Sequence, residues 1–220
     1  MADPSAAPQR RAPAPVGWLL AMSLGLVIVL AGPLLLFNPW FVAFEQARNE
    51  VPTLLGTSQA QVDSVTASIV GDLFTGGDFT EGLASSPLLT ADERSHMRDV
   101  GGLVRALAVI LAVATTIAVV CVVLLRRERR RVGRLLLIAG GVTGSLAVVL
   151  AALFAVAFDQ AFLAFHEVFF PGGNFLFGPD SNLLRLFPEG FWFEVSLVAG
   201  ALIIATATAA TLVGWRLARF

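Results

Sequence analysis

The sequence has no lysine, a single cysteine and few charged residues of either sign. One cysteine, Cys121, excludes a disulfide within the chain, a paired-cysteine redox motif and a cysteine-rich zinc site. Charged residues make up only 14% of the chain, whereas a soluble domain uses about a quarter of its residues to cover its surface. The net charge of −1 also excludes a nucleic-acid partner bound by bulk phosphate neutralisation.

Hydrophobic residues make up 56% of the chain and gather in four long runs, at 17–37, 103–125, 135–157 and 193–215. Each run is long enough to cross about 30 Å of hydrocarbon as a helix. The first run exceeds the usual ~7–15 apolar residues of a secretory signal, and no clear cleavage site follows it, so we expect it to be retained. The sequence predicts an all-α, polytopic membrane protein with a four-helix transmembrane bundle.

The distribution of arginine predicts the orientation of this bundle. Ten of the fifteen arginines precede the first run, lie between the second and third, or follow the fourth. Because basic residues are enriched in cytoplasmic loops, both termini and the loop at 126–134 should be cytoplasmic. The loops at 38–102 and 158–192 should then be extracytoplasmic. The arginine-rich loop is also compatible with nucleic-acid or anionic-lipid binding, but a topology signal explains it fully.

Boundaries inside the chain follow from composition and capping motifs. Residues 1–16, rich in Pro, Ala and Arg, are predicted to be a disordered cytoplasmic tail, and 17–220 a single transmembrane domain. Ser58 and Gln61 form a capping box that opens a helix to about residue 74. Thr90 and Glu93 form another, from which a helix of about 36 residues should continue through the second span and extend beyond the outer surface. Residues 158–170 should continue the third span until the Pro-Gly-Gly at 171–173.

The chain has only two histidines, His96 and His166. Each lies on an outward extension of a span, so both should sit near the same membrane depth. Asp99 shares a helical face with His96, and Asp159 or Glu167 lies close to His166 along the chain, where a carboxylate can fix the tautomer of an imidazole. These placements predict a shared acid–base site at the outer boundary of the membrane.

No nucleophile accompanies this pair. The sequence has no G-x-S-x-G motif, and Cys121 lies deep in the second span. This favours a reaction whose nucleophile belongs to the substrate, with no cofactor. Two alternatives stay open. One is a metal-dependent hydrolase, for which the histidine spacing gives a weak signal. The other is a non-catalytic scaffold or accessory protein, held together by small-residue faces at Gly140 and Gly144 and at Ala201, Ala205 and Ala209.

Three segments resemble a known family: TADERSHMRDV at 90–100, FHEVFFPGGNFLFGPD at 165–180 and LFPEGFW at 186–192. Together they are similar to the lipoprotein intramolecular transacylase (Lit) family of four-span bacterial membrane proteins. The resemblance implies a bacterial cell-membrane location and, as partners, membrane lipid and a lipoprotein whose N-terminal cysteine carries a diacylglyceryl group. It implies transfer of the sn-2 acyl chain to the α-amine of that cysteine, which gives the lyso-form.

The resemblance also implies roles for particular residues. It makes His96 and His166 the catalytic pair, and supporting positions within the matching segments are Asp99, Glu167, Asn174 and Glu189. Two histidines can divide the work of base and acid, and Asn174 or Arg105 is a candidate donor to the oxyanion. Arg105 lies near the start of the apolar part of the second span.

Overall fold

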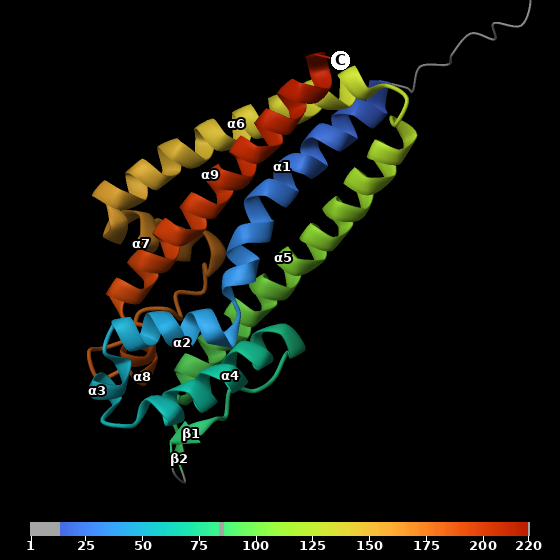
Figure 1. The fold of residues 1–220 in the computed structure, drawn as a ribbon. Helices are drawn as coiled ribbons and strands as arrows, with labels where there is room; N and C mark the ends of the chain where they lie inside the picture. Colours follow the sequence, from blue (N-terminus) through green and yellow to red (C-terminus); the bar gives the residue numbers. More distant parts are fainter. Residues whose placement is uncertain (1–13, 84–85, 220) are drawn as a thin grey trace, which may run out of the picture.

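A computed structural model of the chain describes residues 14–83 and 86–219 (Figure 1). The fold is almost entirely helical, as predicted, with one small antiparallel ribbon that the sequence analysis did not predict. The elements are α1 (Ala14–Leu36), α2 (Pro39–Arg48), α3 (Val51–Leu55), α4 (Gln59–Thr75), β1 (Gly82–Leu83), β2 (Ser86–Pro87), α5 (Ala91–Leu124), α6 (Arg129–Val156), α7 (Phe158–Phe169), α8 (Asn182–Leu186) and α9 (Glu189–Arg219).

Four helices, α1, α5, α6 and α9, are long and apolar enough to cross a membrane, which confirms the four predicted spans. The start of α1, the α5–α6 turn and the end of α9 lie at one end of the bundle, and α2, α3, α4, the β ribbon and α8 form a layer at the other (Figure 1). Helix α1 begins three residues before the predicted span. The predicted tail otherwise lies outside the described residues.

Helix α5 begins as its capping box predicts. The Thr90 hydroxyl accepts from the Glu93 N–H, and the Glu93 carboxylate accepts from the Thr90 N–H. The helix has 34 residues, or about 51 Å at 1.5 Å per residue, which exceeds the ~30 Å of hydrocarbon. The apolar part begins at residue 103, so the first three turns, which carry His96, stand outside the hydrocarbon. The predicted capping box of α4, at Ser58 and Gln61, is also present.

Glycine lets α6 and α9 approach each other closely. A Cβ built on Gly140 would lie 2.7 Å from the Ala207 carbonyl oxygen, and one on Gly144 would lie 3.1 Å from the Ala207 Cβ. The prediction of close packing through these two glycines is therefore correct. The close approach expected of Ala201, Ala205 and Ala209 is not found, because all three are exposed. The side of α9 that meets α6 instead carries Ala207, Thr211 and Gly214.

The prediction that residues 158–170 continue the third span is wrong. The backbone leaves the helical conformation at Ala157, with φ −142° and ψ 49°, and α7 starts in a new direction beside α9 (Figure 1). Phe158 is buried and its ring packs 5.4 Å from that of Phe193 on α9 and 6.2 Å from that of Phe154 on α6. Neither Gly nor Pro marks this break, so the burial of Phe158 is the physical reason for it.

Candidate active site

The structure brings the two predicted histidines together. His96 lies on the second turn of α5 and His166 near the end of α7, and their rings stack with centroids 5.9 Å apart and an interplanar angle of 25°. His96 is buried, with 6% of its surface exposed, and His166 is half-buried. Two imidazoles, whose ring nitrogens can donate or accept a proton, therefore share one site.

Phenylalanine rings surround the pair. Phe170 contacts both imidazoles, with centroids 4.9 Å from His96 and 5.6 Å from His166. The segment after α7 adds Phe175 beside His166 and Phe177 beside His96, at 5.1 and 5.7 Å. Such apolar walls lower the local dielectric, which strengthens electrostatic interactions inside the site.

The tautomer of His166 follows from its one hydrogen bond. Its Nδ1 lies 2.8 Å from the carbonyl oxygen of Phe162, one turn earlier on α7. A carbonyl oxygen only accepts, so Nδ1 carries the hydrogen and donates it. In the neutral ring, Nε2 is then the nitrogen with a free lone pair. The backbone carbonyl thus takes the orienting role that the sequence analysis gave to Asp159 or Glu167, and both of these carboxylates are exposed on α7.

Asn174 and Asp99 bond to each other beside His96. The Asn174 amide donates from Nδ2 to Oδ2 of Asp99 over 2.6 Å. Burial and the neighbouring His166 lower the pKa of His96, while Asn174 and Asp99 oppose this shift. The Nδ1 atom of His96 is buried and has no hydrogen-bond partner within residues 14–83 and 86–219.

Two further predicted residues lie apart from the histidines. Arg105 follows His96 by nine residues, which places it on the opposite side of α5. Its guanidinium donates to the Leu73 carbonyl oxygen over 3.0 Å, so it anchors the end of α4 and is not the oxyanion donor considered from the sequence. Glu189 is exposed in the first turn of α9.

Sequence reasoning gave Glu93 only a capping role and missed a second one. This carboxylate is 2% exposed and accepts from three groups: the Thr90 N–H at 2.7 Å, the Leu183 N–H at 3.1 Å and the Ser181 hydroxyl. Asn182 adds a bond from its Nδ2 to the Leu88 carbonyl oxygen. Glu93 therefore fixes the start of α8, and with it the segment that carries Asn174, Phe175 and Phe177, to the first turn of α5.

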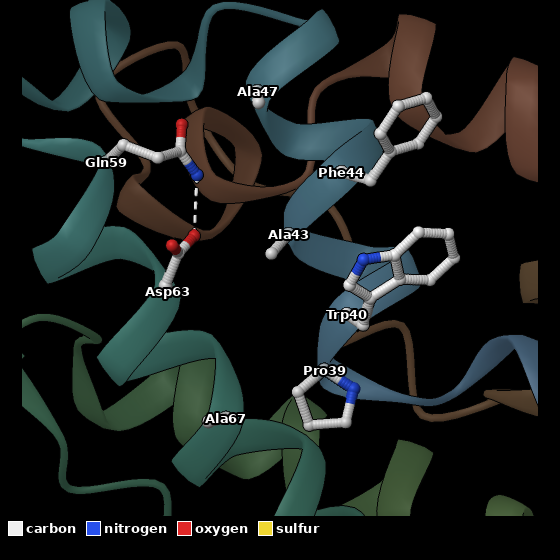
Figure 2. A pocket seen from close by; sticks show the side chains of 8 residues that line it. All are labelled: Pro39, Trp40, Ala43, Phe44, Ala47, Gln59, Asp63 and Ala67. Carbon is white, nitrogen blue, oxygen red and sulfur yellow. Dashed lines mark hydrogen bonds between the residues drawn. The ribbon is translucent and has the colours of Figure 1, made fainter.

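A groove of about 500 Å³ lies elsewhere, between α2 and α4 (Figure 2). The rings of Trp40 and Phe44 stand on its α2 wall, and the Gln59 amide donates to Asp63 on the α4 wall. It is separate from the histidine pair, since neither His96 nor His166 lines it.

These features define an integral membrane protein with four helical spans and a stacked pair of histidines on α5 and α7. The chain belongs to the lipoprotein intramolecular transacylase (Lit) family, whose family model matches residues 18–192. The prediction of an acyltransferase is confirmed at the level of this family.

Solved structures show the same fold. An in meso structure of the lipoprotein intramolecular transacylase Lit from Bacillus cereus is similar with a TM-score of 0.80, at 17% identity over 93% of this chain and 94% of the other. Two structures of that protein with a histidine substituted have TM-scores of 0.73 at 17% identity; they cover 93% of this chain and 91% and 92% of their own. The comparison with curated proteins found no match.

Proposed function

We propose that this chain moves the sn-2 acyl chain of a diacylglyceryl-cysteine lipoprotein onto the α-amine of the same cysteine. Family membership supports an acyl transfer of this kind. The observation that carries the proposal for this chain is the stacked His96–His166 pair, in which one ring has a free Nε2. Such a pair supplies proton transfer without a protein nucleophile, as a reaction between an amine and an ester of one molecule requires.

All bonds that form and break in this reaction belong to the substrate. The cysteine nitrogen attacks the ester carbonyl carbon, the new C–N bond forms, and the bond from that carbon to the glycerol oxygen breaks. The nitrogen of the neutral amine loses one proton and the glycerol oxygen gains one. Correct positioning of two groups on one molecule lowers the barrier by about 7–11 kcal/mol. The two proton transfers remain for the protein, and each contributes about 10²–10⁴-fold in rate.

The hydrogen bonds favour a division of labour between the histidines. The Nε2 of His166 is the basic nitrogen of a half-buried ring, so we assign it the proton of the attacking amine. His96 is the partner through which the glycerol oxygen is protonated, and one N–H of Asn174 remains free to donate to the oxyanion. The phenylalanines offer an apolar surface to the acyl chain.

We further propose that the histidine site faces the extracytoplasmic side. Eight arginines, at 126–134 and 216–219, lie at the opposite end of the bundle and support this orientation. The glycerol ester of a membrane-anchored lipoprotein lies at the boundary between headgroups and hydrocarbon, at the depth expected for residues that stand just beyond the apolar part of α5.

Expression in a bacterial strain that lacks lipoprotein N-acylation tests this function. The reaction is an isomerisation, so the intact mass of the lipopeptide does not change, and the acyl position must be read by tandem mass spectrometry or by mild alkaline treatment, which cleaves esters and spares amides. We expect one alkali-stable acyl chain with the wild-type chain and none with His96→Ala or His166→Ala. Gln160→Ala, an exposed change on α7, serves as the control.

The same assay separates the alternatives raised by the sequence. Stable membrane expression with only ester-linked chains contradicts acyl transfer. Release of free fatty acid would identify a hydrolase. N-acylation by the histidine variants at the wild-type level would contradict the histidine site, and no change in the lipopeptide with any variant would favour a scaffold.

A further inference from the structure

We infer that Asp99 binds the protonated α-amine of the lipoprotein substrate, an inference that rests on the proposed function. Asp99 follows His96 by three residues on α5, so the two side chains lie on neighbouring parts of one helical face. Its side chain is exposed. The Asn174 amide donates to Oδ2 of Asp99, and Asn174 and Asp99 both lie close enough to His96 to act on its imidazole.

The substrate brings a positive charge to this site. A free α-amino group has a pKa of about 7.7–8.0, so it arrives mostly as an ammonium ion at neutral pH. The rings around the histidines are phenylalanines, which offer no negative charge. A strongly hydrated ammonium ion enters an apolar site at high cost unless it meets a carboxylate.

Asp99 suits this role better than the other carboxylates nearby. Glu93 is buried and already accepts three hydrogen bonds. Asp92 lies seven residues before Asp99, two turns farther from the membrane. In the part of the chain that the structure describes, the arginines that form ion pairs are Arg48, Arg131 and Arg185, and none of them pairs with Asp99.

Asn174 shows how a nitrogen donor reaches the carboxylate. Its Nδ2 lies 2.6 Å from Oδ2 of Asp99, slightly shorter than the ~2.7–2.9 Å of charge-assisted N–H···O⁻ bonds. A primary ammonium ion offers three donors of the same kind. It can bond to Asp99 while its nitrogen stays beside the histidines, where deprotonation must occur.

The reaction removes the charge that Asp99 recognises. The ammonium nitrogen loses two protons: one is passed on to the glycerol oxygen and the other leaves to solvent, and the nitrogen becomes a neutral amide. Asp99 therefore stabilises bound substrate and not bound product. The carboxylate would select a lipoprotein with a free amino terminus and help to release the lyso-form.

Binding of two synthetic lipopeptides to the full chain in nanodiscs tests this inference. One carries the diacylglyceryl-cysteine with a free amine, and the other is its N-acyl lyso isomer. The measurements use a His166→Asn background, which prevents turnover. We expect Asp99→Asn to weaken binding of the free-amine peptide about tenfold, because one charge-assisted hydrogen bond is lost. Binding of the lyso isomer should stay the same, which also shows that the variant is folded.

Two further variants sharpen the result. Asp99→Glu keeps the charge and should retain most of the preference for the free amine, and Asp92→Asn should have no effect on either peptide. If Asp99→Asn weakens binding of both peptides equally, or of neither, the inference is overturned while the proposed function stands. Failure of both peptides to bind when Asp99 is intact, together with no N-acylation in cells, contradicts the proposed function and the inference with it.

Discussion

The rings of His96 and His166 stack 5.9 Å apart, although 70 residues separate them in the chain. One belongs to a helix that also spans the membrane, and the other to the short helix that turns away from α6 at Ala157. The pairing therefore depends on the break before α7. A straight continuation of α6 would carry His166 along the line of that helix and away from α5.

The rate of acyl transfer should rise as the pH increases from about 6 to 8, because the α-amine, whose ordinary pKa is about 7.7–8.0, attacks only in its neutral form. Burial and the neighbouring His166 lower the pKa of His96, which favours its neutral form over the same range. Initial rates of N-acyl formation in nanodiscs check this, with circular dichroism over the same range as a control for unfolding. A flat profile would contradict attack by the α-amine.

His166→Asn should separate the orientation of this residue from its chemistry. The asparagine NH₂ can donate to the Phe162 carbonyl oxygen as Nδ1 of the imidazole does, but it provides no counterpart of Nε2. We expect activity to fall about 10²–10⁴-fold with little change in thermal stability. Activity within a few-fold of the wild-type chain would show that Nε2 is not the base.

Loss of the Glu93 carboxylate should free the segment that covers the histidines. Glu93→Ala leaves the hydrogen of the Ser181 hydroxyl and the Leu183 N–H without their acceptor. Each unpaired donor lowers the free energy of unfolding by about 1–3 kcal/mol. We expect lower thermal stability, faster hydrogen exchange over residues 174–186 and reduced activity, with partial recovery in Glu93→Gln.

The second capping box provides the matched control for Glu93. Gln61 holds the same position in α4, where its side chain bonds only to neighbouring residues of that helix start. Gln61→Ala should lower the free energy of unfolding by about 1 kcal/mol or less and leave activity unchanged. Equal effects of the two alanine variants would show that Glu93 acts only as a cap.

Alanine substitutions at two adjacent glycines of α6, Gly140 and Gly141, should have opposite effects on stability. A Cβ on Gly140 would lie 2.5 Å from the Thr211 hydroxyl oxygen and 2.7 Å from the Ala207 carbonyl oxygen. Gly140→Ala should therefore push α9 away and lower the free energy of unfolding by about 1–3 kcal/mol. A Cβ on Gly141 meets nothing within 4 Å, so Gly141→Ala should be neutral or stabilise by up to about 1 kcal/mol. Thermal unfolding in detergent compares them, and similar losses would contradict the packing described.

Glu45, on α2, predicts a pH dependence of stability. The residue is 2% exposed, and burial, followed by the neighbouring Glu194 carboxyl, raises the pKa of its carboxyl while Arg48 opposes the rise. A raised pKa in the folded state means that stability is greatest at low pH and is lost as the pH rises through that pKa. The unfolding temperature should thus fall as the pH increases above about 4.5, the ordinary value for glutamate.

Glu45→Gln should remove most of this dependence and raise stability near pH 8, because the amide cannot ionise. Glu50→Gln, an exposed change in the same region, should behave like the wild-type chain. Thermal unfolding of the three proteins across the pH range makes the comparison. A slope unchanged in Glu45→Gln would assign the dependence to another group.

Local patterns in the sequence were sufficient for much of the fold. The four apolar runs predict the spans because about 20 apolar residues have few stable places other than a bilayer. The capping boxes at Ser58 and Thr90 predict the starts of α4 and α5 because a cap depends on residues only three apart. The two histidines could be placed on outward extensions for the same local reason.

Periodicity gives the faces of a helix but not which face meets a partner. For this reason the stripe at Ala201, Ala205 and Ala209 was expected to pack closely although it is exposed, and Asp159 or Glu167 was expected to orient His166 in place of the Phe162 carbonyl. Glu93 looked like an ordinary cap because its bonds to Ser181 and Leu183 cross about 90 residues of sequence.

The sequence by itself therefore determined the membrane spans, the helix starts and the identity of the two imidazoles. Only the tertiary structure decided the turn at Ala157, the stacking of His96 on His166 and the hydrogen bonds that fix one tautomer. The physical reason is distance along the chain. Helix formation and membrane burial depend on residues a few positions apart, whereas the site depends on the packing of α5, α7 and the segment that follows α7.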